Sequence, residues 1–155
     1  MLKKITNQEM VDLMIGIQHS GSASIGNAKF KYALMLNENH ISEKIKSLKK
    51  VIEDTLKTFI DAFKVEFSGK PGKDLSVTFF NLIGIPLPEG CVLEKNQELI
   101  LQLQDKFTAE FKTAEELMNE TIELNLHIVS LENVPDAIDY AILKKIKVII
   151  ADEKV

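Results

Sequence analysis

The stretch TIELNLHIVSL, residues 121–131, decides the fold class because it is the clearest strand pattern in the chain. Apolar residues alternate with polar ones along it, and this period of two indicates a half-buried β-strand with one solvent face. The apolar face is expected to carry Ile122, Leu124, Leu126 and Ile128, and the polar face Glu123, Asn125 and His127. The sequence therefore predicts a small sheet.

After this strand the sequence predicts a turn and a last helix. The run ENVPD, residues 132–136, has turn composition. Pro135 fits the first turn of a helix, where its missing amide hydrogen removes no helical bond. The helix would be lined by Ile138, Ile142, Ile146 and Ile149, which recur at helical spacing.

Before the strand, two long helical patterns are expected to pack as an antiparallel hairpin. One covers about residues 42–67, with Ser42 as its N-cap, and the other about residues 94–118. The run LNENHISEK, residues 36–44, is rich in cap-type residues, so we expect a bend or break in the helix that starts near Phe30. Core phenylalanines are expected at the helically spaced positions Phe59, Phe63, Phe107 and Phe111.

The first helix is predicted for residues 7–18. Thr6 and Glu9 have the spacing of a capping box, in which a hydroxyl and a carboxylate each satisfy one backbone amide at the helix start. A glycine inside a helix costs about 1 kcal/mol relative to alanine, so Gly16 indicates close packing. The apolar face holds Met10, Leu13, Met14 and Ile17.

An apolar β insert is expected at about residues 68–93, between the two helices of the hairpin. Its run LSVTFFNLIGI, residues 75–85, is rich in β-branched and aromatic residues and has two apolar faces. We predict a single domain over residues 1–155 of class α+β. It is predominantly helical, with a long antiparallel helical hairpin, a small antiparallel β-sheet and a C-terminal helix.

Composition excludes several function classes. The chain of 155 residues has a formal net charge of −4, whereas nucleic acids and anionic membranes require a cationic surface. All basic residues are lysines, so arginine, the usual bidentate ligand of phosphate, is missing. The single cysteine, Cys91, fits a reducing cytoplasm. We find no apolar run long enough for a membrane span and no signal-peptide pattern, so we expect a cytoplasmic protein.

The run HSGSASIGNAK, residues 19–29, resembles a phosphate-binding loop at first sight. A P-loop needs a preceding strand and a lysine directly after its second glycine. Here a predicted helix precedes, and Asn27 follows Gly26. Two interpretations remain: a joint between helices, or a looser anion site at a helix N-terminus with an aromatic residue to stack a base. The ligand-binding candidates are Gly26, Asn27, Lys29, Lys31 and Tyr32.

No constellation of residues supports an enzyme. The histidines lack metal-ligand spacing, and the acid pairs lie opposite apolar stripes, as on solvated helix faces. A nucleophile pair of Cys91 with a histidine stays open, because such partners are spatial rather than sequential. We expect no catalytic residue, no metal site and no cofactor. The residues considered are His19, His40, His127, Glu53–Asp54 and Glu115–Glu116.

Short sequence motifs stand out near the start and near the end of the chain. Ile5, Thr6, Asn7 and Glu9 match an ITN-x-E-L start. Lys29, Tyr32, Ala33 and Asn37 fit a K-x-x-Y-A-I-x-x-N helix with one residue of slack. With its acidic-apolar strand, short turn and final helix after residue 120, the chain resembles an uncharacterised small-protein family encoded by phages and prophages of low-GC Gram-positive bacteria. Residues 68–93 depart from that pattern. The resemblance implies a viral origin and carries no catalytic residue across.

Two function classes remain open. The first is a non-catalytic binding protein that acts through protein–protein contacts, either as an inhibitor of a host process or host defence or as a virion assembly factor. Its partner-binding candidates in the insert are Phe79, Phe80 and Leu82. The second is a small-ligand-binding protein that sequesters a nucleotide immune signal. We expect a homo-oligomer in the cytoplasm of an infected or lysogenic bacterial host, with a host or virion protein as partner and without membrane or nucleic acid.

Overall fold

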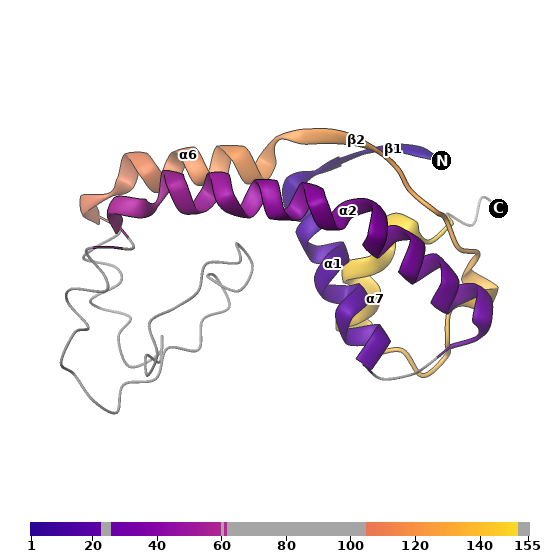
Figure 1. Ribbon diagram of the computed structural model, residues 1–155. Helices are drawn as coiled ribbons and strands as arrows, with labels where there is room; N and C mark the ends of the chain where they lie inside the picture. Colours follow the sequence, from indigo (N-terminus) through magenta and orange to yellow (C-terminus); the bar gives the residue numbers. More distant parts are fainter. Residues whose placement is uncertain (23–25, 60, 62–104, 152–155) are drawn as a thin grey trace, which may run out of the picture. The chain divides into compact units, whose positions relative to one another are not determined.

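The computed structural model describes residues 1–22, 26–59, 61 and 105–151 (Figure 1). They belong to two compact units, Met1–Lys46 with Asn119–Val155, and Ser47–Met118. The predicted insert, with Phe79, Phe80, Leu82 and Cys91, lies outside the described residues, and so does Phe63. A single domain stays a prediction.

The predicted fold class is confirmed, since the structure is mostly helical with a two-stranded antiparallel sheet and a C-terminal helix. The elements in chain order are β1 (Leu2–Thr6), α1 (Asn7–Ser22), α2 (Ala28–Thr55), α6 (Thr108–Asn119), β2 (Thr121–Asn125), the 3-10 turn η1 (Leu131–Asn133), α7 (Tyr140–Ile146) and the 3-10 turn η2 (Lys147–Ile149). Among the described residues no helix is both long and apolar enough to cross a membrane.

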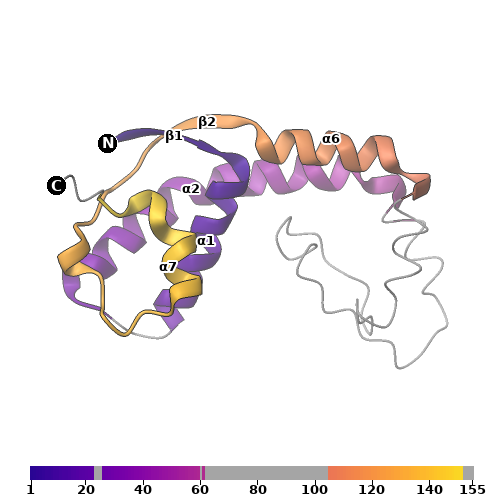
Figure 2. The ribbon, with the colours of Figure 1, turned by 180° about the vertical axis from the view of Figure 1, so that it is seen from behind.

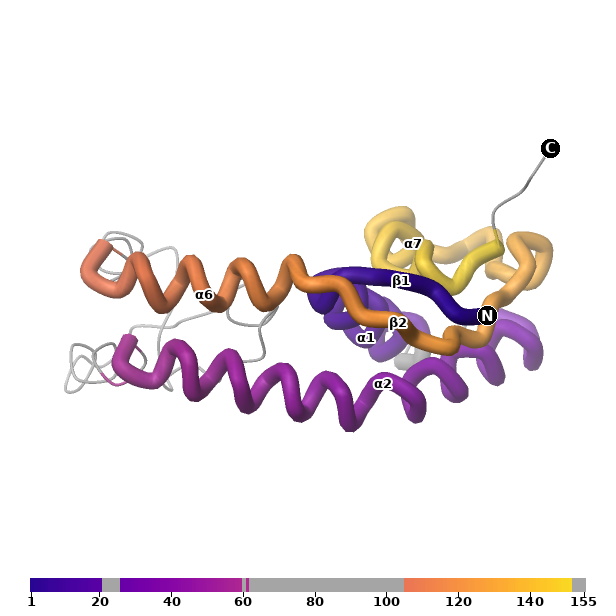
Figure 3. The backbone as a smooth tube through the Cα atoms, turned by 90° about the horizontal axis from the view of Figure 1, so that it is seen from above, coloured from indigo at the N-terminus to yellow at the C-terminus, as the bar shows by residue number. Residues whose placement is uncertain are grey.

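The sheet of the first unit joins β1, near the start of the sequence, to β2, which follows α6. β1 runs antiparallel to β2, with Lys3 opposite Leu124 and Ile5 opposite Ile122 (Figure 3). The sequence patterns missed β1, because Ile5 is its only fully buried residue. From the core side of β1, the Lys3 Nζ donates a hydrogen bond to the Val148 carbonyl at 2.8 Å.

β2 is shorter than the predicted strand and ends at Asn125. Its inward alternation continues to Leu126 and then shifts by one residue, so that Val129 is buried and Ile128 only half-buried. The shift arises because Val129 pairs with the C-terminal segment. Its amide donates to the Ile149 carbonyl at 2.8 Å, and its carbonyl accepts from the Ala151 amide at 2.9 Å.

α1 begins with the predicted capping box. The Glu9 amide donates to the Thr6 hydroxyl at 3.0 Å, and the Thr6 amide donates to the Glu9 carboxylate at 3.2 Å. All four predicted apolar-face residues are buried. The helix continues to Ser22 and packs against α7 (Figure 2). Gly16 lies at this contact, and the close packing predicted for it is confirmed. A Cβ at this position would lie 2.6 Å from the Ile146 Cγ2.

The predicted break within residues 36–44 is wrong, since α2 passes through them without interruption. Asn37, one of the cap-type residues of this run, is buried, and its side-chain amide donates to the Ala33 carbonyl one turn back at 2.9 Å. The Ser42 hydroxyl donates to the Asn39 carbonyl. Bonds of this kind to preceding carbonyls are compatible with a continuous helix.

The predicted start of the last helix at Pro135 is also wrong. α7 starts at Tyr140, because the carboxylate of Asp139, the N-cap residue, accepts a hydrogen bond from the Ala141 amide at 2.8 Å. Pro135 instead lies in a turn, with its carbonyl bonded to the Ile138 amide. Of the predicted apolar stripe, Ile146 and Ile149 are buried, whereas Ile138 and Ile142 are half-buried.

The second unit contains the end of α2 and most of α6, which lie side by side as a helical hairpin (Figures 1 and 3). Phe59 is fully buried there, and its ring contacts Phe111 and Phe107 edge to face, with centroids 4.6 Å and 6.0 Å apart. The core role predicted for Phe59 is thereby confirmed, whereas Phe107 and Phe111 are half-buried against its ring. Among the residues of this unit that the structure describes, the other buried ones are Leu48, Ile52, Leu56, Ala114 and Met118.

Candidate binding site

The loop before α2 holds the first predicted ligand-binding residue, Gly26, which has a packing role in the structure. Its φ is +106°, a backbone conformation that residues other than glycine rarely adopt. A Cβ at this position would lie 2.6 Å from the Phe30 Cδ1 and 3.0 Å from the Pro135 Cγ. A close approach of three chain segments therefore explains the glycine without a ligand.

Asn27 caps α2. Its Oδ1 accepts a hydrogen bond from the Phe30 amide at 2.9 Å, and its Nδ2 donates to the Asn133 Oδ1 at 3.1 Å. The side-chain oxygen thus already occupies a position that a phosphate oxygen would take at a helix N-terminus. Lys29 and Lys31 are exposed on the first turn of the helix. This arrangement offers an anion fewer free donors than the sequence predicted.

We predict that Gly26→Ala lowers the free energy of unfolding by about 2 kcal/mol. The positive φ is unfavourable for alanine, and the space that its methyl group would need is already filled. Urea unfolding followed by circular dichroism measures this loss. Asn27→Ala is the matched comparison, with an expected loss of about 1 kcal/mol from the missing cap. Equal stability of Gly26→Ala and the unchanged protein would contradict the packing role.

Tyr32, the last predicted ligand-binding residue, lies away from the cap and against the chain after β2. Its ring contacts the His127 ring edge to face, with the centroids 6.0 Å apart and the planes at 78°. Tyr32 is 54% exposed and Met35, on the next turn, is 49% exposed. The structure therefore brings Tyr32 to His127, a pairing that the sequence did not indicate.

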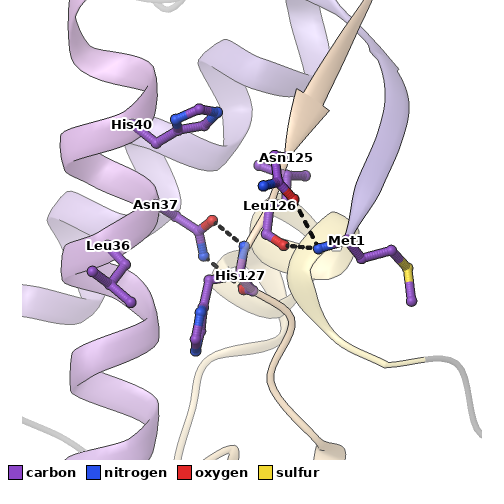
Figure 4. Close-up of a pocket in the computed structure, with 7 residues that line it drawn as sticks. All are labelled: Met1, Leu36, Asn37, His40, Asn125, Leu126 and His127. Carbon is purple, nitrogen blue, oxygen red and sulfur yellow. Dashed lines mark hydrogen bonds between the residues drawn. The ribbon is translucent and has the colours of Figure 1, made fainter.

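Next to this contact lies an open depression of about 310 Å³ (Figure 4). Such a volume is at the lower end of the range for small-molecule sites. The depression lies between α2 and the end of β2. Its lining residues are Met1, Leu36, Asn37, His40, Asn125, Leu126 and His127.

Asn37 fixes the two walls of the depression to each other. Its Oδ1 accepts from the His127 amide at 2.9 Å, and its Nδ2 donates to the His127 carbonyl at 2.8 Å. The Asn37 side-chain amide therefore bonds to the backbone amide and carbonyl of His127, as the backbone of a neighbouring strand would. Figure 4 shows both bonds running from the helix to the chain after β2.

Met1 adjoins the other side of β2. Its amino group donates to the Asn125 Oδ1 at 3.0 Å and to the Leu126 carbonyl at 2.9 Å, and its carbonyl accepts from the Leu126 amide at 2.8 Å. Two hydrogen-bonded partners, Met1 and Asn37, thus hold residues 125–127 from opposite edges.

The chemistry of the depression suits binding. Its ionisable side chains are His40 and His127, both exposed, and none of the lining residues that the structure describes carries a carboxylate. Across the described ranges, 1–22, 26–59, 61 and 105–151, no cluster of histidine, cysteine, aspartate and glutamate could hold a metal ion. The site offers imidazole and amide groups beside exposed apolar side chains.

Sequence reasoning missed most of these residues. It assigned His40 to a helix break and His127 to a solvated face, and it gave Leu36 no role. One signal was present, because Tyr32, Leu36 and His40 recur every four residues and so share one face of a helix. The pairing of that face with residues 125–127 depends on tertiary structure and has no local signal.

Comparison with known proteins gave no match to a family model, to a curated sequence or to a solved structure.

Proposed function

We propose that this chain is a non-catalytic binding protein that acts through protein–protein contacts, of the kind that phages and prophages use to inhibit a host process or to assemble virions. The observation that carries the proposal is the surface formed by Tyr32, Met35, Leu36, His40 and His127, which we call the α2 face. It combines exposed aromatic and apolar groups with an open depression. The viral context comes from the sequence motifs at the two ends.

The α2 face has two properties typical of protein-binding surfaces. Tyr32 presents an apolar ring with a polar tip, a combination enriched at interfaces. The face is also preorganised, because Asn37 is buried and bonds α2 to His127. A preorganised surface loses less conformational entropy when a partner binds. The proposed setting is the cytoplasm of a bacterial host.

Site-specific photo-crosslinking tests the proposal. A photoreactive phenylalanine analogue replaces Tyr32 in the full chain, produced in a low-GC Gram-positive bacterium, and irradiation is expected to give one discrete protein adduct. The matched control places the analogue at Val51, which is 50% exposed on the same helix. No adduct from position 32, or the same adducts from both positions, would show that the α2 face does not bind a protein.

The alternative, sequestration of a nucleotide-type signal, has its own readout. Native mass spectrometry of the purified chain would then show an added mass of nucleotide size that disappears in mild denaturant. Such a ligand, together with the lack of a protein adduct, would replace the present proposal. The capped N-terminus of α2 is the reason that we rank the nucleotide second.

A further inference from the structure

Resting on the proposed function, we infer that a protein bound by the α2 face is a second copy of this chain. The geometry points to an antiparallel pair of α2 helices, one from each copy, related by a twofold axis beside Met35. The contact uses the exposed side of α2 between residues 28 and 42, a segment that belongs to the first unit. Two symmetric ion pairs between Lys31 and Glu38 set its register.

One side of α2 has the spacing of a helix that packs against another helix. Residues recur there at alternating intervals of four and three, the mean period of 3.5 that forms a continuous seam between paired helices. This α2 stripe consists of Ala28, Tyr32, Met35, Asn39 and Ser42. All but Ser42, which is half-buried, are exposed. In Figure 3, α2 lies at the margin of the first unit, with β2 along one side of it.

Two charges of opposite sign flank the α2 stripe on the same side. Lys31 is exposed and Glu38 is half-buried, and neither side chain forms an ion pair or a hydrogen bond with a described residue. Glu43, by contrast, is paired within the helix with Lys46 at 3.1 Å. Lys31 and Glu38 are seven residues apart, which is two turns and about 10 Å along the helix, so they lie on one side of it.

An antiparallel pair satisfies both charges at once. A twofold axis midway between Lys31 and Glu38 brings Lys31 of each copy level with Glu38 of the other, because residue i then contacts j and j contacts i. The same axis passes beside Met35, so the exposed Met35 and Tyr32 side chains of the two copies cover one another. A parallel pair would instead leave Lys31 level with Lys31, where like charges repel.

Charge reversal tests the pairing. Sedimentation equilibrium of the purified full chain is expected to show a monomer–dimer equilibrium. Lys31→Glu and Glu38→Lys should each raise the dissociation constant at least about tenfold, since either change puts like charges together at two symmetric places. The combination of both reverses the two ion pairs without removing them. It should restore a dissociation constant within about threefold of that of the unchanged chain.

Lys29→Glu is the matched control. Lys29 is exposed like Lys31 and near it in sequence, but it lies about 160° around the helix from Lys31, on the other side of the α2 stripe. Its reversal changes the net charge as Lys31→Glu does and should leave the dissociation constant unchanged. Equal weakening by both changes would show that the register is wrong.

Two other results would overturn the inference. One is a chain that stays monomeric at about 1 mM, a concentration at which even a weak dimer is populated. The other is a combined variant that does not recover the association lost in the single variants, or single variants that lose none. Each of these results is independent of any partner from the host.

The photo-crosslink from position 32 separates this inference from the proposed function. An adduct of twice the chain mass, formed by the purified protein, supports the dimer. An adduct with a different protein, formed by a chain that is monomeric on its own, would overturn the dimer and leave protein binding intact. No adduct from position 32, in the purified chain or in cells, would overturn both.

Discussion

Asn37→Leu is expected to lower the free energy of unfolding by about 3 kcal/mol, the largest loss for a single polar residue here. Leucine has a similar size but no hydrogen-bonding group, so the His127 amide and carbonyl both lose their partner. A buried polar group left without a partner costs about 1–3 kcal/mol, and two are affected. Chemical denaturation measures the loss directly.

The control for this prediction is Asn39→Leu. Asn39 is exposed on the same helix, and its side chain takes part in no described hydrogen bond, although its backbone carbonyl accepts one from the Ser42 hydroxyl. Its substitution should change the free energy of unfolding by about 0.5 kcal/mol or less. If both leucine variants lose the same small amount, the amide of Asn37 does not fasten α2 to the chain after β2.

Gly16→Val is expected to cost about 3 kcal/mol, because it inserts a branched side chain where α1 and α7 touch. A Cβ alone would lie 2.6 Å from the Ile146 Cγ2 and 3.0 Å from the Lys145 Cβ. Ile146 is fully buried and has no room to withdraw. The gain in helix propensity over glycine is less than about 1 kcal/mol and does not offset this clash.

Thermal and urea unfolding of Gly16→Val measure the effect, with Gln18→Val as the control at an exposed position of α1. A second test uses the smaller change Gly16→Ala combined with Ile146→Leu, which removes the Cγ2 methyl from the contact. We expect the combination to be more stable than the sum of the two single changes predicts. If the stability changes of the two substitutions are strictly additive, the close contact between Gly16 and Ile146 is not the cause of the destabilisation.

Local patterns predicted α1 and its cap, since these depend on neighbours within four residues. Thr6 and Glu9 bond as their spacing indicates, and Phe59 is buried as its helical period indicates. The predictions failed where the role of a residue depends on a partner that is distant in sequence. Asn37 has cap-type chemistry, but within a continuous helix its side-chain amide bonds to His127, which lies after β2 and 90 residues away in sequence.

The candidate site shows the same division. Gly26 and Asn27 were selected for chemistry that the structure uses for a turn and a cap. Tyr32 was selected for stacking, and the structure does place it against a ring, that of His127. The pairing of β1 with β2 had no local signal, because the two strands lie far apart in sequence.

That pairing of distant ends governs the order of folding. β1 finds its partner only after residues 121–126 have been synthesised, so an emerging chain holds an unpaired edge for most of its synthesis. Closing a loop this long costs entropy before any ladder bond forms, which slows folding. Replacing residues 47–118 by a short linker would shorten the segment that separates β1 from β2, and the first unit is then expected to form its sheet sooner.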